Sequence, residues 1–271
     1  PDKETRVPEA DLSTVRPAHS TATAHSRPAR LPALAPLAWL AAGWDDFRST
    51  GYRAAFYGLV FAAMGWAIGF VYETQWQLTM GLTAGFLLLG PFVCAGIYEL
   101  SRQRERGEPA DLVRSLSCWR RAPGPIGFFA AMLTFLMIVW ARVSVVLFAL
   151  SSNTEFPTMR GVLGQIASAS NFEFLALWSA VGFVFASLVF AISIVSVPMM
   201  LDRGSDTMVA VFTSARALAE NPAAAYVWAA SIVLLIGASL VLWLGLLVVT
   251  APLVGHATWH AYRALVPPAP G

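Results

Sequence analysis

The sequence predicts an all-α membrane protein, and composition, run length and repetition are the three observations that lead to this fold class. Of its 271 residues, 57% are hydrophobic and 13% are charged, whereas roughly a quarter of the residues in a soluble domain are charged. Several charge-free runs are long enough to cross a hydrocarbon core of ~30 Å. A short amphipathic helix followed by an apolar hairpin occurs three times, which indicates an internal repeat. We therefore expect a polytopic bundle of about six transmembrane helices, arranged as three hairpins that each follow an interfacial helix.

The chain divides into a polar tail, a membrane domain and a short end segment. Residues 1–30 are rich in Pro, Ala, Ser, Thr and Arg and lack the apolar run of a signal peptide. This composition predicts a disordered cytoplasmic tail. Residues 31–266 form the predicted membrane domain, and residues 267–271 form a short C-terminal tail.

Three short helices are expected at the membrane interface, because apolar residues recur in them at helical spacing. They cover Leu37–Phe47, Leu112–Trp119 and Asp206–Glu220. The apolar stripes are Leu37, Leu40, Trp44 and Phe47 in the first helix, Leu112, Leu116 and Trp119 in the second, and Met208, Val211, Phe212 and Ala215 in the third. In the first helix this leaves Asp45 and Asp46 to face water. An apolar loop is the alternative for that segment.

Six apolar segments are predicted to span the membrane. They cover residues 54–72, 78–100, 127–150, 174–200, 223–238 and 241–264. The last two come from one apolar block, which as a straight helix would be roughly 63 Å long at 1.5 Å per residue and must therefore fold. We place its turn near Gly237–Ser239. The alternative is a single span ending near Thr250 and followed by an interfacial helix, which gives five spans in all.

The repeat also predicts the orientation of the chain. Gly90–Arg102 aligns without gaps with Ala251–Arg263, so Arg102 and Arg263 are expected on the same side of the membrane. An excess of arginine beside span ends marks the cytoplasmic side, and residues 101–121 show such an excess. Both termini are therefore expected in the cytoplasm.

His256 and His260 are the candidate ligand residues, since four residues of helix place both on one face. Two imidazoles at this spacing can ligate a metal ion or the edge of a haem, with Glu99 or Asp202 as further donors. The alternatives are contacts with backbone carbonyls or lipid headgroups near the cytoplasmic interface, and a pH-sensitive contact. Apart from this hypothesis, no cofactor or metal is expected.

Arg142 is the candidate functional charge inside the membrane, because it lies within the third predicted span. An arginine at mid-bilayer costs at least ~2.5–3.5 kcal/mol, whereas one near the edge can extend its guanidinium to the interface. The alternative is an arginine inside a cavity, paired with an acid such as Glu155 or Glu173 or with an anionic ligand.

The sequence does not favour an enzyme or a nucleic-acid-binding protein. It contains no phosphate-binding loop, no HExxH motif and no ordered Ser, His and Asp motif. Cys94 and Cys118 are isolated and make no CxxC pair. The sequence has no basic stripe outside the predicted spans of the kind that binds nucleic acid. The expected partner is therefore the lipid bilayer.

Three segments, Trp39–Phe61, Gly90–Glu99 and Gly255–Tyr262, resemble a bacterial family of integral membrane proteins of unknown function, DUF2189. The resemblance extends from about Leu37 to Val266. It implies a multi-pass protein of the bacterial inner membrane. Some members of the family carry the label of cytochrome c oxidase component, which implies a respiratory complex as a candidate partner. A catalytic haem–copper site is not implied, because the chain has only four histidines.

These observations lead to three functional hypotheses. The first is a non-catalytic accessory or assembly partner of another membrane complex. The second is a small transporter or channel-like protein that uses Arg142 and the face of His256 and His260. The third is a haem- or metal-binding membrane redox protein.

Overall fold

The structure, a computed structural model, describes residues 30–74, 76–151 and 172–267, and every regular element in these ranges is a helix. This confirms the predicted all-α class. The predicted disordered tail, except Arg30, lies outside the described residues, as does all of the C-terminal tail except Pro267.

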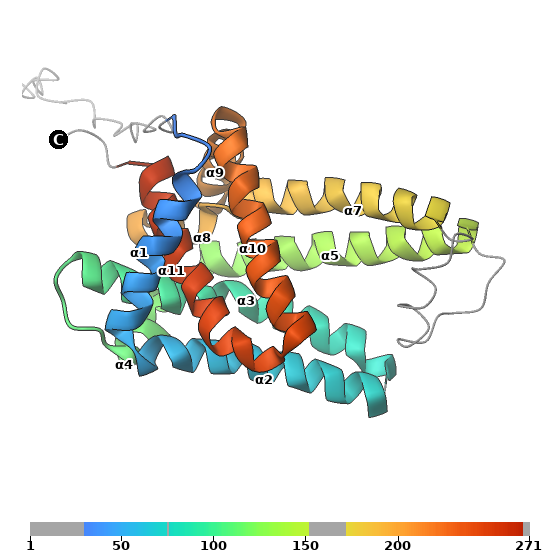
Figure 1. The fold of residues 1–271 in the computed structure, drawn as a ribbon, viewed down its shortest axis with the longest axis horizontal. Helices are drawn as coiled ribbons and strands as arrows, with labels where there is room; N and C mark the ends of the chain where they lie inside the picture. The colour runs from blue at the N-terminus through green and yellow to red at the C-terminus, as the bar shows by residue number, and fades with distance from the viewer. Residues whose placement is uncertain (1–29, 75, 152–171, 268–271) are drawn as a thin grey trace, which may run out of the picture.

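Two groups of helices cross each other (Figure 1). Four long helices run along the longest axis: α2 (Tyr52–Thr74), α3 (Trp76–Glu105), α5 (Pro123–Ser151) and α7 (Phe172–Ser193). Three helices lie across them near one end: α1 (Ala35–Thr50), α10 (Pro222–Leu242) and α11 (Leu247–Leu265). The short elements α4 (Leu112–Leu116), η2 (Cys118–Arg121), α8 (Ser196–Arg203) and α9 (Thr207–Glu220) complete the same end. Because the α10–α11 pair crosses the α2–α3 and α5–α7 pairs, the three predicted hairpins are not equivalent.

In the part of the chain that the structure describes, five helical segments are long and apolar enough to cross a membrane. They are Tyr52–Thr74, Pro123–Leu147, Glu173–Arg203, Pro222–Leu242 and Leu244–Leu265. The second predicted span, α3, is not among them. The multi-pass character is thus established, while the count of six spans stays a prediction.

The last apolar block folds into two helices, but its turn lies further along the chain than predicted. α10 continues through Gly237 to Leu242, and Trp243 adopts an extended conformation before the 3-10 turn η4 (Leu244–Leu246). The Trp243 ring covers Gly245, where an added Cβ would lie 2.4 Å from the indole. The predicted turn at Gly237–Ser239 was therefore wrong. The alternative of one helix reaching Thr250 was wrong as well.

The fourth predicted span is interrupted near its end. α7 stops at Ser193, and α8 begins at Ser196. A proline ring collides with the carbonyl four residues earlier, which for Pro198 is the carbonyl of Ile194. Pro91 and Pro252, in contrast, lie inside the continuous helices α3 and α11.

Most of the predicted apolar stripes of α1 and α9 face outward, while another face of each helix is buried against the protein. α1 buries Pro36, Trp39, Gly43, Asp46 and Thr50, and α9 buries Thr207, Ala210, Val211, Ser214 and Ala217. Most of the predicted apolar stripes remain partly or largely exposed, including Leu37 and Phe212. The reason is close packing: at Gly43 an added Cβ would lie 2.6 Å from the backbone nitrogen of Ala257 on α11. Small residues face the protein, and large apolar ones face outward.

The ends of two of the short helices are well defined. Asp206 caps α9 by accepting a 2.8 Å hydrogen bond from the amide of Met208, as expected for an N-cap. The second interfacial helix is shorter than predicted, because α4 ends at Leu116 and the chain continues as the 3-10 turn η2.

The crossing of the two groups creates the hydrophobic core. Trp39 of α1 packs edge-on against Trp228 of α10, with ring centroids 5.9 Å apart. Trp259 and Tyr262 of α11 are fully buried beside them in the same core cluster. This end of the molecule therefore holds the side chains of α1, α3 and α11 in fixed positions.

Candidate functional site

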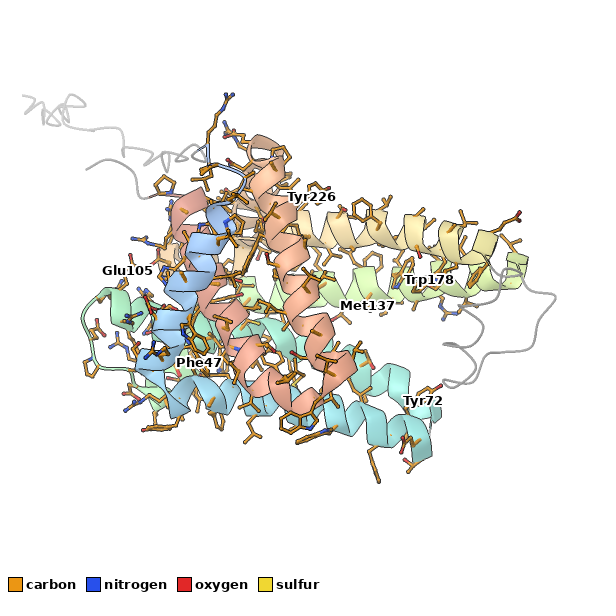
Figure 2. The ribbon with its side chains drawn as sticks, viewed as in Figure 1. Phe47, Tyr72, Glu105, Met137, Trp178 and Tyr226 are labelled. Carbon is orange, nitrogen blue, oxygen red and sulfur yellow. The ribbon has the colours of Figure 1, made fainter. Side chains whose placement is uncertain are left out.

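The last two turns of α3 gather charged and polar residues of the crossing end into two neighbouring sets of contacts, which together we call the polar junction. From α3 it contains Glu99, Ser101, Arg102, Arg104 and Glu105. From the other elements it contains Asp46, Arg114, Arg121, Asp202, His256, His260, Trp259, Tyr262 and Arg263. Figure 2 places Glu105 and Phe47 at this end, far from Tyr72 at the tip of α2. Three carboxylates organise the junction.

The first carboxylate is Asp46 of α1, which is 2% exposed. Its Oδ2 atom accepts hydrogen bonds from the Ser101 hydroxyl at 2.6 Å and from Nε2 of His260 at 3.0 Å. Its Oδ1 atom forms an ion pair with Arg104. One side chain thereby joins α1 to both α3 and α11.

His256 lies next to this carboxylate and is fully buried. Its Nδ1 atom is 2.7 Å from the Ser101 oxygen and 3.9 Å from Oδ2 of Asp46. Since Ser101 has one hydroxyl proton and donates it to Asp46, the Ser101 oxygen accepts from Nδ1–H of His256. Serine thus stands between the acid and the imidazole. Nucleophilic catalysis requires the imidazole to take the serine proton, so this order does not activate Ser101.

The second carboxylate is Glu99 of α3, which is fully buried and surrounded by three arginines. Arg121 donates to both carboxylate oxygens, at 2.7 and 3.0 Å. Arg102 and Arg114 approach to 3.2 and 3.4 Å. The hydrogen bonds to Glu99 raise the pKa of Arg121. This cluster fixes α4 and η2 against α3.

The third carboxylate is Asp202 of α8. It pairs with Arg102 at 3.3 Å and with Arg263 at 3.4 Å, and it accepts a 2.9 Å hydrogen bond from the Tyr262 hydroxyl. Arg263 also pairs with Glu105 at 2.8 Å. Because Arg102 and Arg263 share Asp202, the prediction that they lie on the same side is confirmed.

The predicted donors lie in this junction, but their partners differ from those expected. His256 and His260 share one helix face and contact side chains of α1 and α3. Glu99 and Asp202 pair with arginines instead of joining the histidines. The acid beside the histidines is Asp46, which the sequence predicted to face water. Asp46 lies seven residues after Trp39 and three residues after Gly43 on α1. At helical spacing this places the three residues on one face, and that spacing was the sequence signal for the burial of Asp46.

Arg142 lies apart from the junction. It is an exposed residue of α5, five positions beyond Met137, which Figure 2 places on the projecting part of the molecule. Among the described residues, no hydrogen bond or ion pair joins it to His256 or His260. The structure therefore does not bring together the two features that the transport hypothesis combines.

The haem or metal hypothesis for His256 and His260 stays a prediction. Nδ1 of His256 and Nε2 of His260 are engaged by Ser101 and Asp46, so only the second nitrogen of each ring could present a lone pair to a metal. In residues 30–74, 76–151 and 172–267, no group of three or more His, Cys, Asp or Glu is placed to hold a metal ion.

The fold and the junction define a multi-pass helical membrane protein whose buried charges hold crossing helices together. The profile of the DUF2189 family, described as predicted integral membrane protein, matches residues 78–202. This segment runs from α3 to Asp202, includes Glu99 and the Gly90–Glu99 motif, and confirms the family resemblance. Comparison with curated proteins and with solved structures found no match.

Removing the Asp46 carboxylate should destabilise the protein. The Asp46→Ala variant removes the acceptor that Ser101, Arg104 and His260 use inside the fold. Breaking a buried charged pair costs about 3 kcal/mol or more. Thermal and SDS unfolding in mild detergent should show this loss. The matched control is Asp45→Ala, at the exposed neighbouring position. Equal stability of the two variants would contradict the role given to Asp46.

The junction should also weaken at low pH. Burial alone raises the pKa of Asp46, but hydrogen bonds from His260 and Ser101 and the nearby histidine charges lower it below its ordinary 3.8. The ionised form is therefore favoured by folding, and its contribution is complete above about pH 4 and lost as the pH falls through the folded pKa. Unfolding measured from pH 6 to pH 2.5 should show the stability gap between wild type and Asp46→Asn closing below pH 4. Parallel curves would argue against this linkage.

Proposed function

We propose that this protein is a non-catalytic membrane protein that acts as an accessory or assembly partner of another membrane complex. The observation that carries this proposal is the state of the polar junction. Its four carboxylates, its arginines and both histidines are all engaged in ion pairs or hydrogen bonds. In the part of the chain that the structure describes, Ser193 Oγ is the one buried side-chain polar atom without a hydrogen-bond partner. Groups engaged in this way hold helices in place, which supports a structural role for the junction.

The outer surface of α9 supports a binding role. α9 turns small side chains toward the protein and carries Met208 and Phe212 outward, with 46% and 67% of their surfaces exposed. It is not one of the segments suited to span a membrane. Large apolar residues on a helix outside the spans favour contact with a partner, because exposed apolar patches mark interaction sites. Because some members of the resembling family are labelled cytochrome c oxidase components, a respiratory oxidase is the first partner to test.

Weakening this surface should release the partner while the fold stays intact. Phe212→Ser combined with Met208→Ser removes the outward apolar side chains but leaves the buried face of α9 unchanged. Purification from native membranes in mild detergent should recover oxidase subunits with the wild type and lose them with the double variant. The control is Arg216→Gln, which breaks only the exposed 2.6 Å pair with Glu220 on the same helix. A wild-type chain that elutes alone would overturn the accessory role.

We also propose that the protein lies in the inner membrane of a bacterium with both termini in the cytoplasm. Arg106 and Arg120 are exposed at the junction end, and an excess of arginine marks the cytoplasmic side. Alkaline phosphatase fused after Gly271 should stay inactive in cells, because it folds only outside the cytoplasm, and a fluorescent protein at the same place should be bright. An active phosphatase would reverse the assigned orientation.

A further inference from the structure

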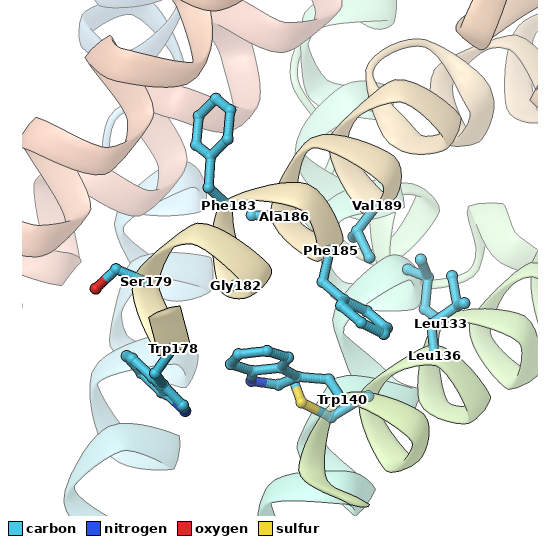
Figure 3. A pocket seen from close by; sticks show the side chains of 11 residues that line it. Leu133, Leu136, Trp140, Trp178, Ser179, Gly182, Phe183, Phe185, Ala186 and Val189 are labelled. Atoms are coloured by element: carbon cyan, nitrogen blue, oxygen red, sulfur yellow. The ribbon is translucent and has the colours of Figure 1, made fainter. Parts of the chain in front are cut away.

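An apolar groove lies between α5 and α7 (Figure 3). Its volume is about 540 Å³, within the ~300–1,000 Å³ of typical ligand sites. In its lining of eleven residues, Ser179 is the one with a hydroxyl group. We propose that this groove holds one acyl chain of a bilayer phospholipid as a tightly retained ligand.

Three packed aromatic rings form one wall of the groove. Trp140 stands between Trp178 and Phe185, with ring centroids 5.4 Å away on either side. Gly182 makes room for this arrangement, since an added Cβ there would lie 3.1 Å from the Trp140 ring. The indole N–H of Trp178 donates to Ser144 at 3.3 Å, which fixes its orientation. Because the rings pack on one another and on Gly182, they border the hollow rather than fill it.

The position of the groove identifies its occupant. Both helices belong to segments suited to span the membrane, and in the most apolar window of α5 only 6% of residues are buried inside the protein. The groove therefore continues the surface that faces the bilayer, and its occupant comes from the lipid. Water has too few polar partners there to replace it.

The length of the groove matches one leaflet. From Trp178 to Val189 the lining follows α7 for roughly 16 Å at 1.5 Å per residue, about half of a ~30 Å hydrocarbon core. Tryptophan favours the interface between membrane and water. Trp178 and Ser179 therefore mark the headgroup end, and Leu133 and Val189 mark the end of the chain.

Filling the groove tests this assignment. Ala186→Trp on α7 and Met137→Trp on α5 each place an indole in the groove from a side chain that is exposed, so the folded protein tolerates them. The matched controls are Val184→Trp and Ile138→Trp, at exposed positions of the same helices outside the lining. Thermal unfolding in detergent is measured first, to check that all four variants fold.

The readout is native mass spectrometry with lipid extraction of protein purified from membranes in mild detergent. We expect about one phospholipid per chain in the wild type and in both controls, and at least about tenfold less in the two filled variants, as loss of ~1.4 kcal/mol of binding produces. Three results would overturn the proposal: a wild type without phospholipid, filled variants that retain it as the wild type does, or retention of an isoprenoid quinone instead.

Discussion

The pairing of three carboxylates at the crossing of the helices, two of them buried, is the constraint on which the rest of the structure depends. A buried charge is tolerated only when it is paired and hydrogen-bonded. Asp46, Glu99 and Asp202 meet this requirement with donors from four different elements. Each carboxylate also contacts a residue of α3. The end of α3 therefore sets the positions of α1, α4, α8 and α11 relative to one another.

Close backbone packing makes these contacts possible. Gly43 lets α1 approach Ala257 of α11, and Gly255 lets α11 approach Ile97 of α3. At Gly58 an added Cβ would overlap the carbonyl of Val248, the group that Pro252 leaves without its N–H partner. Because glycines occupy these points, α3 and α11 come close enough to α1 for their side chains to reach Asp46. In a membrane, where lipid tails are as apolar as leucine, small residues and buried polar contacts are what hold helices together.

The two ends of the molecule differ in the residues that they carry. The junction end contains the charges and fixes the crossing, while α5 and α7 project from it with an almost wholly apolar surface. The groove between them lies on the projecting end, remote from the buried histidines. The bilayer therefore meets the apolar projecting helices, while charged side chains pair with one another at the crossing.

The sequence by itself determined the membrane class, the all-α fold and most of the helices, because composition and apolar run length act locally. It also predicted that Arg102 and Arg263 share one side. It failed at Asp46, which was expected to face water and is buried. It also failed at Trp243, where the last apolar block turns. Apolar periodicity indicates that a helix has two faces, but in a membrane the more apolar face turns to lipid as readily as to protein. Only the crossing of α11 over α1 and α3 decided that Asp46 lies beside His256 and His260, because that contact joins residues about 210 positions apart and depends on how whole helices pack.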